Sequence, residues 1–243
     1  MTARLRADIL LVRRGLFESR AKAQAAIAAG GVTADGAPVR KASDAIAVNA
    51  AVAAQPAFEW VSRGGVKLSD GIDRFGVAVA GRICLDVGAS TGGFTQVLTA
   101  RGARRVYAVD VGTGQLHPSL RGHPRVISFE QTDIRTLDAA RLDEPPDFIV
   151  LDVSFISLKL VLPAAIALAA RPAHVLGLIK PQYEAPRAHS KKGIVRDPAV
   201  QQVACADIAS FAGSIGCTDV VTFPSPISGT DGNREFFVGA TIG

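Results

Sequence analysis

Short apolar runs recur beyond residue 80, and most of them end at a charged residue. They predict strands at 82–86, 105–110, 126–130, 147–152, 174–180, 217–223 and 234–241. Between them, longer stretches at 93–101, 158–171 and 198–215 predict helices. Strands that alternate with helices predict an α/β fold, in which a mostly parallel, doubly wound sheet binds its ligands at the carboxyl ends of the strands. No helix separates the last two strands, so we expect a hairpin whose last strand is antiparallel.

The first 60 residues follow a different pattern. Four apolar residues at helical spacing predict a first helix that ends near Gly15. Ser19 is typical of the N-cap of a second helix that ends at Gly30-Gly31. The four are Leu5, Ile9, Val12 and Leu16. The turn pair Asp35-Gly36 predicts a short hairpin, and the alanine-rich stretch 50–56 predicts a linker. We therefore expect a small α+β domain over 1–58 and a larger domain over 59–243.

Composition narrows the class of protein. The chain has 243 residues, 27 Lys plus Arg against 22 Asp plus Glu, and 48% hydrophobic residues, which is typical of a globular protein. Its three cysteines form no CxxC and its four histidines are scattered, so we expect neither a disulfide framework nor a metal site. The longest apolar run, 160–170, is shorter than the roughly 20 residues of a membrane-spanning helix. We expect a cytoplasmic protein without stable membrane insertion, most simply a monomer.

Positive charge is concentrated at the start of the chain. Residues 1–22 contain six basic and two acidic side chains. These arginines either form an ordinary solvated helix face or contact RNA phosphates, which guanidinium groups bind well. The candidate RNA-binding residues are Arg4, Arg6, Arg13, Arg14, Arg20, Lys22, Arg40, Lys41 and Arg63.

A glycine-rich loop follows the first strand of the larger domain. It lacks the GxGxxG of dinucleotide-binding proteins and the lysine of a Walker motif, which disfavours NAD and ATP. Asp110, 22 positions after Gly88, is placed to bind a ribose, and Asp133 is placed to contact an adenine. A glycine-rich turn with Asp86, Asp110 and Asp133 at the strand ends suits S-adenosylmethionine, because this nucleoside has no pyrophosphate for the loop to bind. The candidate cofactor-binding residues are Asp86, Gly88, Ala89, Ser90, Thr91, Gly92, Gly93, Phe94, Asp110, Val111, Asp133 and Ile134.

Charged residues at the strand ends supply candidate catalytic groups. Asp152 ends the fourth strand, Lys180 ends the fifth, and Glu235 opens the antiparallel last strand, so all three should lie at one rim. Lys67 lies near the start of a helix before the first strand. A single such residue is more often part of a surface ion pair, but four that converge on one rim favour a catalytic site.

Two sets of motifs resemble known families. Residues 4–12, Arg14-Gly15-Leu16 and 19–23 resemble the S4 RNA-binding domain. Residues 62–68, 86–94, 110–115, 152–157, 193–198 and 225–233 resemble FtsJ-type 2′-O-ribose methyltransferases, and the whole chain resembles the TlyA family of ribosomal RNA methyltransferases, some of which are also called hemolysins. The chain departs from that pattern at Asp133, Tyr183 and Pro186, where the family often has Asn, Phe and Gly.

The resemblance implies an S-adenosylmethionine-dependent methyltransferase fold with a seven-stranded sheet, and a Lys-Asp-Lys-Glu catalytic set on Lys67, Asp152, Lys180 and Glu235. It implies methylation of ribose 2′-hydroxyls in ribosomal RNA, typically at cytidines of the 16S or 23S molecule. Lys180 is then the candidate base, with its protonation state left open. Two alternatives are an inactive RNA-binding protein and a hemolysin, which a liposome-leakage assay separates. The modified nucleotide and the subunit cannot be read from the sequence.

Overall fold

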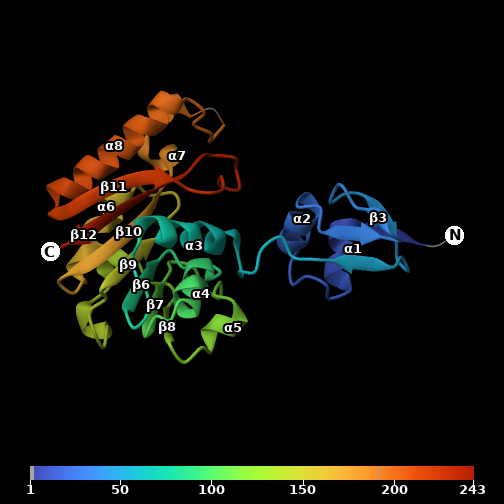
Figure 1. Ribbon diagram of the computed structural model, residues 1–243, viewed down its shortest axis with the longest axis horizontal. Helices are drawn as coiled ribbons and strands as arrows, with labels where there is room; N and C mark the ends of the chain where they lie inside the picture. The colour runs from blue at the N-terminus through green and yellow to red at the C-terminus, as the bar shows by residue number, and fades with distance from the viewer. Residues whose placement is uncertain (1–2, 191) are drawn as a thin grey trace. The chain divides into compact units, whose positions relative to one another are not determined.

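The computed structural model describes residues 3–190 and 192–243 of the chain (Figure 1). It divides into two compact units, an N-terminal unit, Met1–Glu59, and a C-terminal unit, Trp60–Gly243. Each unit has its own hydrophobic core.

The N-terminal unit combines two helices with two small antiparallel sheets. Its elements are β1 (Arg4–Arg6), α1 (Ala7–Arg13), α2 (Arg20–Ala28), β2 (Val32–Ala34), β3 (Ala37–Pro38), β4 (Ala45–Ala47) and β5 (Val52–Ala54). β1 pairs with β4, and β2 pairs with both β3 and β5. Two predictions are confirmed: Ser19 caps α2 by accepting the Lys22 N–H, and the β2–β3 turn has left-handed φ values of 51° at Asp35 and 79° at Gly36.

Two predictions for this unit are wrong. The expected first helix begins too early, because Leu5 belongs to β1, and its predicted apolar face leaves Ile9 36% and Leu16 42% exposed. The face that α1 buries instead includes Leu10 and Leu11. The predicted linker is wrong at Val52–Ala54, which forms β5. Both errors come from strand pairing between segments far apart in the sequence.

A seven-stranded sheet forms the centre of the C-terminal unit (Figure 1). Its strands are β6 (Ile83–Val87), β7 (Arg105–Val109), β8 (Val126–Phe129), β9 (Phe148–Leu151), β10 (Ala173–Ile179), β11 (Cys217–Pro224) and β12 (Phe236–Ile242). They lie in the order β11-β12-β10-β9-β6-β7-β8, and β12 runs antiparallel to the other six strands, which are parallel to one another. The seven predicted strands, the closing hairpin and its antiparallel strand are confirmed.

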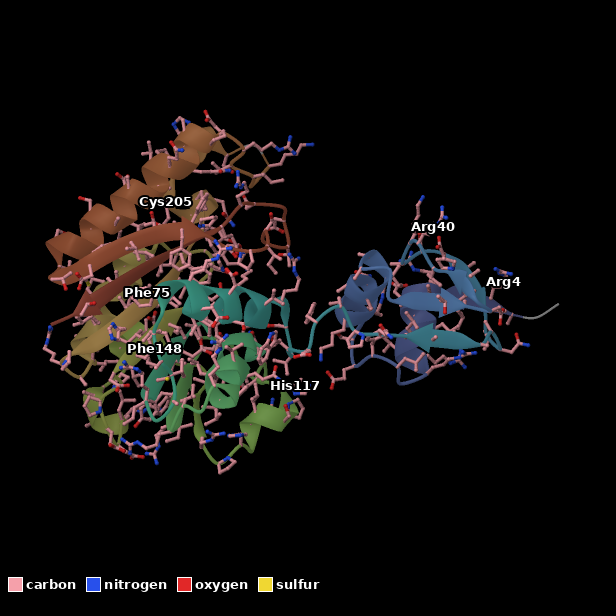
Figure 2. The ribbon with its side chains drawn as sticks, viewed as in Figure 1. Arg4, Arg40, Phe75, His117, Phe148 and Cys205 are labelled. Atoms are coloured by element: carbon pink, nitrogen blue, oxygen red, sulfur yellow. The ribbon has the colours of Figure 1, made fainter. Side chains whose placement is uncertain are left out.

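Helices cover both faces of this sheet. The longer ones are α3 (Arg63–Phe75), α4 (Gly93–Ala100), α6 (Leu158–Ala167) and α8 (Pro198–Ser214). Apolar residues of α3 and α4 pack on one face, around Phe148, and those of α6 and α8 pack on the other (Figure 2). Burial of each large apolar side chain contributes about 1.5–3 kcal/mol. Short turns complete the unit: α5 (Pro118–Arg121), α7 (Pro181–Glu184), η1 (Ile134–Thr136), η2 (Ala139–Arg141) and η3 (Arg187–His189).

Candidate active site

The carboxyl ends of the parallel strands meet the start of β12 at one rim of the sheet. Ile179 of β10 is paired with Phe236 of β12. Lys180 follows Ile179 and Glu235 precedes Phe236, so these two residues occupy opposite positions at the rim. Asp152 directly follows β9, the other neighbour of β10. The structure therefore brings three of the four predicted catalytic residues to one rim.

Lys67 reaches Glu235 from helix α3. The Lys67 Nζ lies 2.5 Å from Glu235 Oε2, and the two side chains are only 9% and 3% exposed. Helix α3 begins after Ser62, which is extended, and ends at Gly76, whose left-handed φ of 77° stops the helix. A buried ion pair gains little stability after desolvation, so its presence at the rim that also carries Asp152 and Lys180 favours a functional role.

A second ion pair lies at the ends of β9 and β10. The Lys180 Nζ lies 2.6 Å from Asp152 Oδ1 and donates to Ser154 Oγ at 2.8 Å. The lysine side chain is 9% exposed and the aspartate 20%. Two oxygen partners from one loop thus fix the position of this amine.

The glycine-rich loop between β6 and α4 requires glycine at two positions. Gly88 has a φ of +85°, and a Cβ there would lie 2.5 Å from the Asp152 carbonyl oxygen. Gly92 has a φ of +90°, and a Cβ there would lie 2.4 Å from Leu120. The missing side chain at Gly88 allows the loop to lie directly against the segment that carries Asp152.

Asp110 holds this loop in place. Its Oδ2 accepts the Ser90 N–H at 2.8 Å and its Oδ1 accepts the Gly112 N–H at 2.7 Å. Sequence reasoning assigned Asp110 a ribose contact alone, whereas the structure also gives it a role in shaping the loop.

A cavity of about 390 Å³ opens beside the loop and Asp152. Six predicted cofactor-binding residues line it: Gly88, Ser90, Asp110, Val111, Asp133 and Ile134. Sequence reasoning missed the apolar and polar walls formed by Val87, Val109, Gln115, Thr132, Val153, Ser154, Phe155, Ile156 and Val161. Most of these residues follow or end strands, as the predicted ones do, and Val161 lies in helix α6, but none of them carries a charge that marks it out.

The other predicted cofactor residues do not line this cavity. Ala89 and Phe94 are buried in the core, and Asp86 is fully buried. Gly93 packs against helix α3, where a Cβ would lie 2.2 Å from Ser62 Oγ. Thr91 is exposed, and Gly92 packs under Leu120. Apart from the exposed Thr91, these residues pack away from the cavity and support the loop.

Two buried or half-buried carboxylates differ in their environment. Burial raises the pKa of Asp86 to about 7, although the Thr95 hydroxyl donates to its Oδ2 at 2.6 Å. Within the described residues, Asp86 Oδ1 has no hydrogen-bond partner. Asp133, by contrast, is bonded by the Arg135 guanidinium at 2.6 Å, which lowers the pKa of that carboxyl. Asp133, for which the sequence predicts an adenine contact, is thus already paired with Arg135.

Phe155 is a site residue that sequence reasoning missed. It is 88% exposed, has a left-handed φ of 64°, and lines the cavity mouth. Its ring centroid lies 5.3 Å from that of Tyr183. Strained backbone is concentrated at functional sites, and a free aromatic face here offers a stacking surface. Phe155 stands between Ser154 and Ile156, so the sequence gives no sign that its side chain is exposed while Ile156 packs against the core.

The predicted RNA-binding residues are all at the surface or partly exposed, but several already have partners. Arg6 and Arg20 both bind the fully buried Asp8, at 3.1 and 2.7 Å, and the Arg6 contact above all holds the pKa of that carboxyl far below its usual range. Lys22 pairs with Glu18 at 2.6 Å. Arg4 and Arg14 donate to backbone carbonyls of their own unit, and Arg63 donates to the Ser228 carbonyl.

Arg13, Arg40 and Lys41 have exposed side chains, and Figure 2 shows Arg40 projecting from the surface. Among the described residues, no group of three or more His, Cys, Asp or Glu is arranged to hold a metal ion. Within the same residues, none of the helices is both long and apolar enough to cross a membrane.

Comparison with known families agrees with this architecture. The model for FtsJ-like methyltransferases matches residues 60–242, about three quarters of the chain. The chain belongs to the FtsJ-like methyltransferase family. The model for the S4 domain matches residues 5–52 of the same methyltransferase.

Individual relatives share this domain order over nearly their full length. The methyltransferase is 44% identical, over 98% of its chain and 90% of the relative, to the 16S/23S rRNA (cytidine-2′-O)-methyltransferase TlyA of Mycobacterium tuberculosis. It is 38% identical, over 96% of its chain and 98% of the relative, to Hemolysin A of Brachyspira hyodysenteriae. A solved Streptococcus thermophilus structure, described as a possible hemolysin, is 37% identical with a TM-score of 0.79, covering 100% of this chain and 90% of that one.

Proposed function

We propose that this methyltransferase uses S-adenosylmethionine to methylate ribose 2′-hydroxyls of ribosomal RNA, a reaction of the cytoplasm. The observation that carries the proposal is the pair of Lys–carboxylate contacts at one rim of the sheet, Lys67–Glu235 and Lys180–Asp152, of which Asp152 lines the cavity. Membership of the FtsJ-like family and the similarity to TlyA support the reaction and the substrate class.

The cavity fits the proposed cofactor. Its volume of about 390 Å³ lies in the range of small-molecule sites, and Gly88 lets backbone approach closely. Asp110 is placed to accept a ribose hydroxyl, and Ile134 offers an apolar contact for an adenine. The carboxylates of Asp110 and Asp152 line the cavity and provide negative charge for a cationic ligand. When bound, S-adenosylmethionine supplies an electrophilic methyl group.

The two lysines would act on the ribose. We assign Lys180, in its unprotonated amine form, as the group that takes up the 2′-hydroxyl proton, and Asp152 and Ser154 as the partners that hold its Nζ in place. Glu235, directly before the neighbouring strand β12, holds Lys67. Exact placement of two bound reactants supplies much of the acceleration, up to about 7–11 kcal/mol in well-oriented systems.

Phe155 extends this proposal to the target base. In this extension the target nucleotide leaves the RNA stack as its ribose enters the rim, and its unstacked base then needs a new stacking surface. The exposed ring of Phe155, held against Tyr183, provides such a surface at the mouth of the cavity.

The test is to map 2′-O-methyl positions in 16S and 23S ribosomal RNA, as free RNA and as subunits, after incubation with S-adenosylmethionine and the protein. We expect new 2′-O-methyl groups with the wild type and none with Lys180→Ala. The absence of any new 2′-O-methyl group with the wild type on all four substrates would overturn the proposal. The same map identifies the nucleotide and the subunit.

A further inference from the structure

The segment between α7 and α8 carries positive charge that belongs to none of the proposed catalytic residues. We call residues 187–196 the basic segment. In sequence, it contains four Lys or Arg and one His, without any Asp or Glu. It lies between Glu184 and the helix cap Asp197, so its charge is not balanced by acidic residues within it.

A fully buried amide anchors this segment to the active-site rim. Asn233, 1% exposed, donates from Nδ2 to the Gly193 carbonyl at 2.9 Å and accepts the Val195 N–H at 3.0 Å. Gln201 adds a bond to the Val195 carbonyl at 2.8 Å. Gly193 and Val195 of the basic segment are therefore bonded to Asn233 of the β11–β12 loop, which lies beside this part of the segment in Figure 1.

The same loop lies directly against the reactive pair. Gly229 donates its N–H to the Asn233 carbonyl at 2.8 Å. A Cβ at Gly229 would lie 2.5 Å from Glu235 Oε1, so the loop backbone covers the carboxylate that holds Lys67. The loop that binds Gly193 and Val195 through Asn233 is therefore the loop that packs on Glu235.

The described cations of the segment are exposed and unneutralised. Lys192 and Arg196 both have exposed side chains, and neither forms an ion pair with any residue in 3–190 or 192–243. Arg104, at the opposite end of the sheet, instead pairs with Glu144 at 2.7 Å. Lys192 also has a left-handed φ of 53°, an unfavourable conformation that is concentrated at functional sites.

We propose that the basic segment is a second RNA-binding surface, which contacts backbone phosphates next to the target nucleotide. Exposed, unpaired Lys and Arg beside an active site bind phosphates without reading sequence. The anchor at Asn233 would keep these contacts in a fixed position relative to Glu235. This inference rests on the proposed function, because it takes ribosomal RNA as the ligand.

The test compares two variants of equal charge in the full chain. Lys192→Gln/Arg196→Gln removes two cations from the basic segment, and Arg104→Gln/Arg105→Gln removes two from the opposite end of the sheet. Each variant is titrated with 16S and 23S ribosomal RNA transcripts from 50 to 200 mM salt. For the first variant, the log–log salt slope should fall by about 1.4–1.8, which is a change of about 7- to 12-fold over this salt range. The control variant should keep the wild-type slope.

S-adenosylmethionine affinity and the thermal unfolding midpoint should be unchanged in both variants. If the first variant keeps the wild-type slope, or if the control loses as much, the proposal is wrong. Methylation by the wild type is measured on the same transcripts and on subunits. If the first variant loses slope but the wild type methylates none of these RNAs, the result contradicts the proposed reaction and still supports the RNA-binding surface. The two failures are therefore distinguishable.

Discussion

Asp86→Asn should change how the stability of the C-terminal unit depends on pH. Asp86 is fully buried, and burial raises the pKa of its carboxyl to about 7, with Asp152 and Asp110 adding to the rise. Asparagine keeps the shape and can still accept the Thr95 hydroxyl, but it cannot ionise. The substitution therefore isolates the effect of one buried charge.

The size of the effect on the free energy of unfolding follows from proton linkage. The carboxyl has a pKa of about 3.8 in the unfolded chain and about 7 in the folded one, a difference of about three units. At 1.36 kcal/mol per unit, full ionisation costs the folded state about 4 kcal/mol, and relaxation of the site reduces this to about 2–4 kcal/mol. Between pH 4 and 7 the folded state holds a proton that the unfolded chain has released. Stability of the wild type therefore falls as the pH rises through this window and levels off above pH 7.

The assay is urea unfolding at pH 5 and pH 8, followed by fluorescence of Trp60, the single tryptophan, which packs on the core of the C-terminal unit. The amide introduced by Asp86→Asn adds a buried N–H group whose cost is the same at both pH values. The informative quantity is the difference in free energy of unfolding between variant and wild type at pH 8, minus that at pH 5. We expect about 2–3 kcal/mol in favour of the variant.

Asp207→Asn, an exposed carboxylate on α8, is the control and should show no such difference. If the Asp86→Asn difference is the same at both pH values, the carboxyl ionises normally and the reasoning from burial is refuted.

Three further predictions concern binding and chemistry. Calorimetric titration should show binding of S-adenosylmethionine and none of NAD, and tight NAD binding alone would contradict the interpretation of the glycine-rich loop. Lys180→Ala should abolish single-turnover methylation with the cofactor still bound, whereas Asp110→Ala, which frees the Ser90 and Gly112 N–H groups, should weaken cofactor binding and regain part of the rate at saturation. The triple variant Arg13→Gln/Arg40→Gln/Lys41→Gln should lower the log–log salt slope of RNA binding by about 0.7–0.9 per lost contact. It should not lose stability, whereas Arg6→Ala should, because that change leaves the buried Asp8 less well neutralised. An unchanged slope would mean that these three residues do not contact RNA.

The central strands of the sheet were predictable because they are buried on both faces. Such strands form nearly continuous apolar runs, and Phe148–Leu151 and Ala173–Ile179 stand out from the polar segments around them. The N-terminal unit was predicted less well because its strands are two or three residues long. Whether Arg4–Arg6 is strand or helix depends on pairing with Ala45–Ala47, and that partner is about 40 residues away.

The candidate site was predictable where chemistry coincides with a strand end. Asp152, Lys180 and Glu235 follow or precede strands, and topology alone places them at one rim. Features set by backbone conformation were not predictable. The exposure of Phe155 depends on its left-handed φ, and the anchor at Asn233 depends on two loops that meet only in the folded chain.

The two fully buried aspartates show which charges the fold itself requires. Asp8 is bound by Arg6, Arg20 and Gln24, which lower the pKa of its carboxyl, so its contribution to stability is present at neutral pH and is lost only in strong acid. Asp86 has one hydroxyl partner and loses stability when it ionises. Stability alone favours an apolar residue or an amide at position 86. A buried carboxyl that weakens the fold at neutral pH, behind a cavity proposed to hold a cationic ligand, is better explained by ligand binding than by folding. Binding of a cation would then favour the ionised form, so the affinity for S-adenosylmethionine should rise from pH 5 to pH 8 in the wild type and stay constant in Asp86→Asn.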